Sequence, residues 1–148
     1  MKIRRASAGD MAAVMRLVDC VFTQEQQIPK DLNPIAERQC PQWWCIEHDG
    51  EIAGTAALFR ENENWHVGRL AISAPLRGQH MGTALLRYMM RDVFAHDVET
   101  VYLEARDTTV HIMKKLGAKT VGEPVLFYGG RITPMVLQKK DFLEQEEG

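Results

Sequence analysis

A strand, a glycine-containing loop and a helix follow one another in residues 69–86, and this local order restricts the fold more than any other part of the chain. The loop runs from Arg77 to Gly82, and residues 84–94 after it contain neither Gly nor Pro, as expected for a helix. A loop that delivers backbone N–H groups and the open N-terminus of a helix to one point forms a site for an anion. Arg77 adds a planar fork of N–H donors that suits a phosphate. The sequence therefore predicts an anion-binding segment at the end of a buried strand.

Length and composition restrict the class of protein. For 148 residues we expect one domain over 1–143, followed by a frayed tail at 144–148. The net charge of −2 argues against a broad nucleic-acid interface, and no apolar run is long enough to cross a bilayer. The three cysteines form no CxxC pair, which favours reduced thiols over a disulfide framework or a zinc site. We therefore expect a cytoplasmic protein with no nucleic acid, membrane or metal as partner.

Hydrophobic periodicity and turn residues place the other elements. Strands are expected at 2–5, 43–47, 51–59, 65–72, 100–105, 120–127 and 131–138, and helices at 11–22, 34–40, 79–94 and 107–116. This order predicts an α/β (α+β) fold, with a mixed, mostly antiparallel, twisted sheet of six to seven strands flanked by about four helices. The helix at 79–94 is a crossover, so the fourth and fifth strands should be parallel. The glycine loop would then lie at the carboxyl end of the fourth strand, where open α/β sheets bind ligands.

The element order, the Arg77-Gly-x-x-x-Gly82 segment and the helix ending at Gly117 together resemble the GCN5-related N-acetyltransferase (GNAT) superfamily. Two further segments, 21–29 and 127–135, resemble a subgroup of small bacterial members. The resemblance implies a GNAT-like fold with acetyl-coenzyme A as cosubstrate. It also implies that the strand before the loop binds the pantetheine arm and that the loop and helix N-terminus hold the pyrophosphate. The residues at these positions are Leu70, Ala71, Ile72, Arg77, Gly78, Gln79, His80, Met81, Gly82 and Thr83.

The chain departs from the family pattern at three positions. His80 stands where the family usually has Gly, although His tolerates a left-handed backbone better than most residues. Met113 stands where many members have a Tyr that protonates the leaving thiolate, and Met cannot donate a proton. The Glu base often found on the fourth strand is missing, with His66 to Arg69 in its place. Because of these departures, the family pattern does not identify the general base or the general acid in this chain.

Three side chains are candidates for proton transfer near the thioester, each with an ordinary structural role as the alternative. His66 has an unperturbed pKa suited to a base near neutral pH, and Glu104 on the fifth strand is a candidate for the same role through water. Tyr128 is a candidate acid. On the acceptor side, two residues of a loop and one large aromatic side chain are candidates to contact a cationic amine. The alternative for the loop residues is that they are simply solvated, and the alternative for the aromatic residue is that it packs in the core. These acceptor-side residues are Glu25, Gln26 and Trp44.

Three functions remain open. The resemblance implies an acetyl-CoA-dependent N-acetyltransferase that acts on a primary amine of a small molecule or peptide by direct attack in a ternary complex. The missing proton-transfer residues keep open a catalytically weak or inactive acyl-CoA sensor of the same fold. A nucleotide-binding domain of another kind ranks last, because the chain lacks the Lys-Ser/Thr of a phosphate loop and the GxGxxG spacing. A homodimer is a further expectation, since C-terminal strands often pair in this family.

Overall fold

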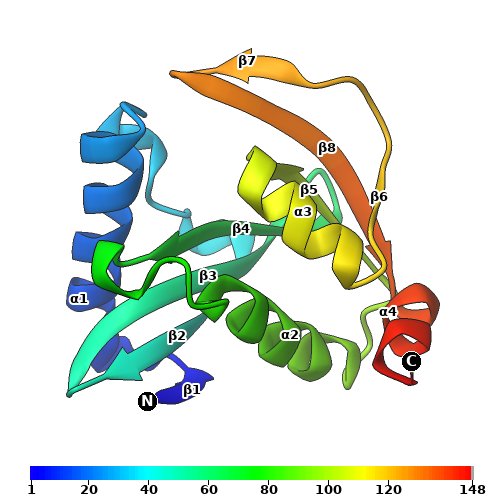
Figure 1. Ribbon diagram of the computed structural model, residues 1–148, viewed down its shortest axis with the longest axis horizontal. Coiled ribbons are helices and arrows are strands. Elements are labelled where there is room, and N and C mark those ends of the chain that lie inside the picture. Colours follow the sequence, from blue (N-terminus) through cyan, green and yellow to red (C-terminus); the bar gives the residue numbers. More distant parts are fainter. Residues whose placement is uncertain (148) are drawn as a thin grey trace.

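Figure 1 shows the computed structural model, which describes residues 1–147. Eight strands form the sheet in the order β1-β2-β3-β4-β5-β8-β6, and β7 pairs with the first residues of β8. The strands are β1 (Lys2–Arg5), β2 (Gln42–His48), β3 (Glu51–Glu61), β4 (Asn64–Ile72), β5 (Thr100–Ala105), β6 (Lys119–Thr120), β7 (Val125–Phe127) and β8 (Gly130–Gln138). The α-helices are α1 (Met11–Val18), α2 (Met81–Phe94), α3 (Asp107–Lys115) and α4 (Lys139–Glu147).

The parallel pair β4 and β5 interrupts an otherwise antiparallel sheet. The two strands share a single register pair within residues 1–147, His66 with Tyr102. Their connection contains α2, so they run in the same direction, as a crossover requires. Past His66 and Tyr102 they no longer pair, and the sheet opens between their carboxyl ends. The expected fold class is confirmed, including the parallel pair around the helix that follows the glycine loop.

Helices cover both faces of the sheet (Figure 1). α1 packs on one face, where Val14 and Val18 contact Trp43 and Phe59 in a small core. α2 and α3 pack on the other face over a larger core, which also includes Trp44 and, from α4, Phe142. Successive residues of a strand point to opposite faces, which is why the neighbouring tryptophans belong to different cores. The two cores therefore hold α1 and α2 on opposite faces of the sheet.

The strand expected at 120–127 is two short strands, β6 and β7, in the structure. Pro124 lies between them and has no N–H to donate to a sheet ladder. β6 pairs with the later part of β8, and β7 pairs with its beginning, across the turn formed by Tyr128 and Gly129. The β7–β8 hairpin therefore projects away from the rest of the sheet, as Figure 1 shows.

The frayed tail expected at 144–148 is corrected for residues 144–147, which belong to α4, whereas residue 148 lies outside the described residues. Two long-range contacts hold this helix. The ring of Phe142 is buried against Phe94, with 5.5 Å between the ring centroids. The Glu146 carboxylate pairs with Arg87 at 3.2 Å and with Arg91 at 2.6 Å. Because all of these partners come from α2, local sequence at the end of the chain gave no sign of them.

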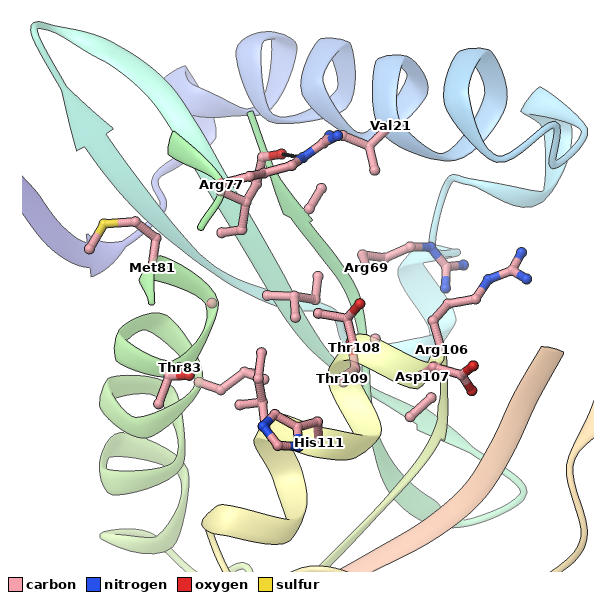
Figure 2. Close-up of a pocket in the computed structure, with 18 of the residues that line it drawn as sticks. Val21, Arg69, Arg77, Met81, Thr83, Arg106, Asp107, Thr108, Thr109 and His111 are labelled. Atoms are coloured by element: carbon pink, nitrogen blue, oxygen red, sulfur yellow. Dashed lines mark hydrogen bonds between the residues drawn. The ribbon is translucent and has the colours of Figure 1, made fainter. Parts of the chain in front are cut away.

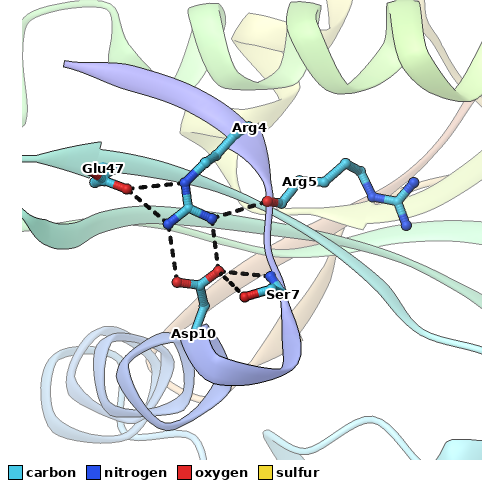
Figure 3. A network of polar contacts seen from close by, with 5 residues as sticks. All are labelled: Arg4, Arg5, Ser7, Asp10 and Glu47. Atoms are coloured by element: carbon cyan, nitrogen blue, oxygen red, sulfur yellow. Dashed lines mark hydrogen bonds and ion pairs between the residues drawn. The ribbon is translucent and has the colours of Figure 1, made fainter.

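A polar network joins β1, β2 and the start of α1 (Figure 3). All five N–H donors of the Arg4 guanidinium are used, on the carboxylates of Asp10 and Glu47 and on the Arg5 carbonyl. Asp10 also accepts hydrogen bonds from the backbone N–H and the hydroxyl of Ser7, at 2.7 and 3.0 Å. Arg4 and then the Ser7 backbone hold the pKa of the Asp10 carboxyl well below its usual value. The network therefore ties the first strand to the helix that follows it.

The variant Asp10→Asn is expected to lower the melting temperature at pH 7 by several degrees. A carboxyl whose pKa is lower in the folded than in the unfolded state stabilises the fold above the unfolded pKa of about 3.9, and this contribution is lost as the pH falls through the folded pKa. The difference between wild type and variant should therefore shrink below about pH 4. Thermal unfolding by circular dichroism from pH 7 to pH 2 measures it, with Asp31→Asn on an exposed turn as the control. A difference that does not change with pH would contradict the assignment.

Candidate functional site

A cleft of about 900 Å³ opens where β4 and β5 separate. Its walls come from β4, the end of β5, the first turns of α2 and α3, and a π-helical segment, η2 (Asp19–Glu25), that extends α1. Figure 2 shows the side chains of these elements converging on one space. Its volume is typical of a ligand pocket, and π-helical turns are frequent at functional sites. We therefore take this cleft as the candidate functional site.

A β-bulge in β4 shapes one wall of the cleft. Gly68 pairs with Ala57 and Ala71 pairs with Thr55, so two β4 residues face a single residue of β3 between these pairs. Arg69 lies in this bulge with a φ of +57°, and the Thr55 hydroxyl donates a 2.9 Å hydrogen bond to its carbonyl oxygen. Beyond the bulge, the edge of β4 that would meet β5 lines the cleft and has no strand partner among residues 1–147.

The bulge also changes which side chains of β4 point into the core. Trp65 and Val67 before the bulge pack into the core under α2 and α3, and Leu70 and Ile72 after it pack into the same core. Strict alternation would have placed Arg69 on that face with Trp65 and Val67. The extra residue instead brings Arg69 to the cleft, where its guanidinium lies over the ring of Phe59 at 5.5 Å. A single backbone irregularity thus delivers a cation to the site.

The loop after β4 and the first turn of α2 form another wall of the cleft. Gly78 has a φ of +78° and His80 a φ of +60°, so His80 does take the left-handed conformation directly before α2. The His80 side chain caps no N–H of the first turn. The backbone N–H groups of Met81, Gly82 and Thr83 consequently have no partner in the described part of the chain. Unpartnered N–H groups at the positive end of a helix dipole form an anion site.

All but one of the residues expected to hold the cofactor line the cleft. The exception is Gln79, whose side-chain Nε2 donates to the carbonyl oxygen of Pro75 at 3.1 Å. The end of β4 and the start of α2, which the glycine loop connects, therefore line one cavity. The residues of the expected set that line it are Leu70, Ala71, Ile72, Arg77, Gly78, His80, Met81, Gly82 and Thr83.

Arg77 is held in place at the mouth of the loop. Its Nε donates to the carbonyl oxygen of Ile72 at 3.0 Å, and its Nη1 lies 2.7 Å from Oε1 of Glu25. The hydrogen bond that Arg77 donates to the Glu25 carboxylate raises the pKa of the guanidinium. Glu25 was expected to select a cationic amine, but its carboxylate already has a cationic partner at the glycine loop. The pair links η2 to this loop.

The three candidate proton-transfer residues lie in different places. Glu104 is exposed and lines the cleft. His66 lies outside it, 15 % exposed, between the rings of Phe59 and Tyr102 with 5.9 Å between centroids on each side. Tyr128 lies in the β7–β8 turn with its side chain 45 % exposed, also outside the cleft. Of the three, the structure brings only Glu104 to the site.

The acceptor-side tryptophan needs a correction. Trp44 is 1 % exposed in the larger core, where its Nε1 donates to Asp92 at 2.9 Å, and it does not line the cleft. Gln26 does line the cleft, and its Oε1 is buried without a hydrogen-bond partner in residues 1–147. Trp44 was misplaced because neighbouring strand residues alternate between the two faces of the sheet, and sequence alone did not say which face held the site.

Several cleft residues were not expected from the sequence. Arg69 and Arg106 line the cleft, as do Thr108, His111 and Lys115 of α3. Met113, at the position of the missing Tyr, is fully buried, whereas His111 two residues earlier faces the cleft, so the two side chains lie on different faces of α3. The i, i+3, i+7 spacing of positions 108, 111 and 115 was a signal that could have identified this face.

Comparison with known proteins gives the family context. A sequence model of the acetyltransferase (GNAT) family matches residues 11–118. No curated protein sequence matches the chain. No helix in residues 1–147 is long and apolar enough to cross a membrane.

Solved structures share the fold at low sequence identity. Escherichia coli ElaA is 21 % identical with a TM-score of 0.75, covering 91 % of this chain and 96 % of its own. Ribosomal-protein-alanine N-acetyltransferase from Brucella melitensis is 15 % identical with a TM-score of 0.74, covering 93 % and 99 %. Spermidine N-acetyltransferase from Vibrio cholerae, solved with CoA and spermine, is 15 % identical with a TM-score of 0.71, covering 96 % and 97 %.

Proposed function

Because this chain belongs to the acetyltransferase (GNAT) family, we propose that it binds acetyl-coenzyme A in the cleft and transfers the acetyl group to a primary amine. One observation carries the proposal: the unpaired edge of β4 and the uncapped N-terminus of α2 meet in a single cavity. The strand edge suits the amide groups of pantetheine, and the helix N-terminus with Arg77 suits the pyrophosphate. The cavity is also large enough for an extended ligand.

In the proposed reaction, the neutral amine attacks the thioester carbonyl carbon directly while both substrates are bound. A C–N bond forms and the C–S bond breaks, so the products are the N-acetylated amine and the free thiol of coenzyme A. The amine loses one proton and the leaving thiolate gains one, so no further reactant is needed. Holding the amine against the thioester contributes to the rate independently of any base.

We assign the role of base to Glu104, acting through water. Its side chain is exposed and lines the cleft, as does that of Arg106, which follows two residues later, directly after β5. An alkylammonium must lose a proton before it attacks, and a carboxylate in the cleft provides a route for that proton to water. The unpartnered Oε1 of Gln26 is available to accept a hydrogen bond from the same amine. His66 and Tyr128 have no part in this proposal, because they lie outside the cleft.

An acyl-CoA sensor is the second candidate function, and the observation that favours it concerns the acid. Met113 is fully buried, and among the described residues that line the cleft there is no tyrosine to protonate the leaving thiolate. A protein with the binding surface but without this acid would hold the coenzyme and turn it over slowly or not at all.

Two measurements decide between these functions. Calorimetric titration with acetyl-CoA tests the site, and release of free thiol from acetyl-CoA across a panel of amines tests the transfer. Binding together with amine-dependent thiol release is the expected result for the enzyme. Binding without thiol release for any amine would favour the sensor, and no binding at high micromolar acetyl-CoA would contradict both.

A further inference from the structure

Two arginines in the cleft have no anionic partner. Arg69 and Arg106 form no ion pair with any Asp or Glu in residues 1–147, whereas Arg77 at the glycine loop pairs with Glu25 at 2.7 Å. Burial lowers the pKa of Arg69, and the more distant Glu61 raises it by less. A partly desolvated guanidinium without a counter-charge is unfavourable unless a ligand supplies one. The charge imbalance therefore points to an anion from outside the chain.

Backbone carbonyl groups hold both guanidinium groups in fixed positions. Arg69 donates from Nε to the Asn33 carbonyl at 2.7 Å and from Nη2 to the Leu32 carbonyl at 3.1 Å. Arg106 donates from Nη1 to the Phe127 carbonyl at 2.6 Å and from Nη2 to the Tyr128 carbonyl at 3.2 Å. A guanidinium has five N–H donors, so each arginine keeps about three for a ligand. Neutral carbonyls orient the side chains without cancelling their charge.

The two arginines come from the two chain segments that bound the cleft. Arg69 lies in β4, three residues after His66, and Arg106 follows directly after β5, four residues after Tyr102, the residue that pairs with His66. Figure 2 shows both guanidinium groups at the same end of the cleft, away from Met81 and Thr83 of α2. The coenzyme phosphates are expected beside α2, so these arginines are free for the second substrate.

The β7–β8 hairpin lies against Arg106 at this end of the cleft. A Cβ added at Gly130 would lie 2.6 Å from Nη1 of Arg106, so the guanidinium packs directly against the backbone of the hairpin there. A Cβ at Gly129 would lie 3.6 Å from the carbonyl oxygen of Gln26, so the hairpin turn reaches the segment that follows η2. The sequence segments 21–29 and 127–135 thus meet beside the two arginines.

We propose that Arg69 and Arg106 bind an anionic group of the acceptor, which is therefore a small amine that also carries a carboxylate or a phosphate. This inference rests on the acetyl transfer proposed above. The planar fork of arginine matches both carboxylate and phosphate oxygens. Glu104, which lines the same cleft two residues before Arg106, is then available to the ammonium end of the same molecule. An acceptor with separated positive and negative ends fits this arrangement of charges.

Binding to the protein saturated with coenzyme A, measured by calorimetry, tests the inference without requiring turnover. The probes are matched pairs: amino acids with their amides, which lack the carboxylate, and phosphoethanolamine with ethanolamine. We expect the anionic member of at least one pair to bind at least about tenfold more tightly than its neutral partner. The pair that shows the larger ratio identifies carboxylate or phosphate as the group recognised.

Variants then assign the preference to the arginines. Arg106→Gln and Arg69→Gln should each remove most of the preference and leave binding of the neutral partner unchanged within about twofold. Arg60→Gln is the matched control, because Arg60 lies on β3 outside the cleft, over the ring of Trp65. If Arg69→Gln fails to fold, Arg106→Gln alone decides the question.

The outcomes separate this inference from the proposed function. Neutral or polycationic amines that bind as tightly as the anionic ones would overturn the inference, whether or not acetyl transfer is observed. A variant that weakens both members of a pair equally would also overturn it. If no amine causes thiol release, the proposed acetyl transfer is contradicted. The binding ratios measured with the matched pairs test the anion site separately, because they do not depend on turnover.

Discussion

Replacing Gly82 by tryptophan is expected to abolish acetyl-CoA binding, with an affinity loss of at least about 100-fold. Gly82 lies in the first turn of α2 and lines the cleft. A Cβ at this position would lie 3.1 Å from Cδ1 of Ile112 and 3.8 Å from Cδ2 of Leu70. An indole has no room against these side chains, so it must occupy the cleft beside the unpartnered N–H groups. Calorimetry with acetyl-CoA measures the loss.

A graded series makes this experiment decisive. Gly82→Ala requires only a small shift of Ile112 and should bind within a few-fold of the wild type, whereas Gly82→Leu should be intermediate. Gly9→Trp is the matched control, because the space around Gly9 is open and it lies in the short 3-10 helix before α1, outside the cleft. A folded Gly82→Trp protein that binds acetyl-CoA as the wild type does would refute the placement of the coenzyme.

The variant Glu104→Gln is expected to lower kcat by about 10²–10⁴ while leaving acetyl-CoA affinity unchanged. Glutamine has nearly the same shape as glutamate but cannot take up a proton, so the substitution removes the proposed base and little else. The rate of thiol release at saturating acetyl-CoA, with the best acceptor from the amine panel, measures the effect. A matching loss in kcat/KM would agree with a group that acts in the transition state.

The control for this variant is Glu123→Gln, at an exposed position outside the cleft. Its kcat should equal that of the wild type, because it changes net charge by the same amount at a distance. A kcat for Glu104→Gln within about threefold of the wild type would remove Glu104 from the role of base. Positioning of the amine, with direct proton loss to water, would then be the remaining source of catalysis.

The glycine loop was predictable because its conformation depends on neighbours in the chain. Gly78 and His80 take positive φ where the sequence places the turn, and Gly117 ends α3 with a φ of +105° as expected. The strand before the loop and the helix after it are equally local, since each follows from a short run of apolar spacing. For this reason every residue predicted to bind the cofactor lines the cleft, with the exception of Gln79.

The face of the sheet that carries the site was not predictable in the same way. Trp43 and Trp44 are identical in type and adjacent in sequence, yet they belong to different cores. His66 looks like an accessible base on a strand, but it is enclosed by the rings of Phe59 and Tyr102 from the neighbouring strands β3 and β5. Both outcomes depend on which strands become neighbours and in which register, and this is decided by contacts distant in sequence.

Residues near one another in the chain were thus sufficient to predict the family, the fold class and the glycine loop that lines the cleft. The end of the cleft that contains Arg69 and Arg106 depends on the tertiary structure, because segments distant in sequence form it. A bulge in β4 brings Arg69 out of the core face, and the β7–β8 hairpin fixes Arg106 beside it. Both features require strand pairing between distant segments, and a shift of one residue in that pairing reverses the direction of a side chain.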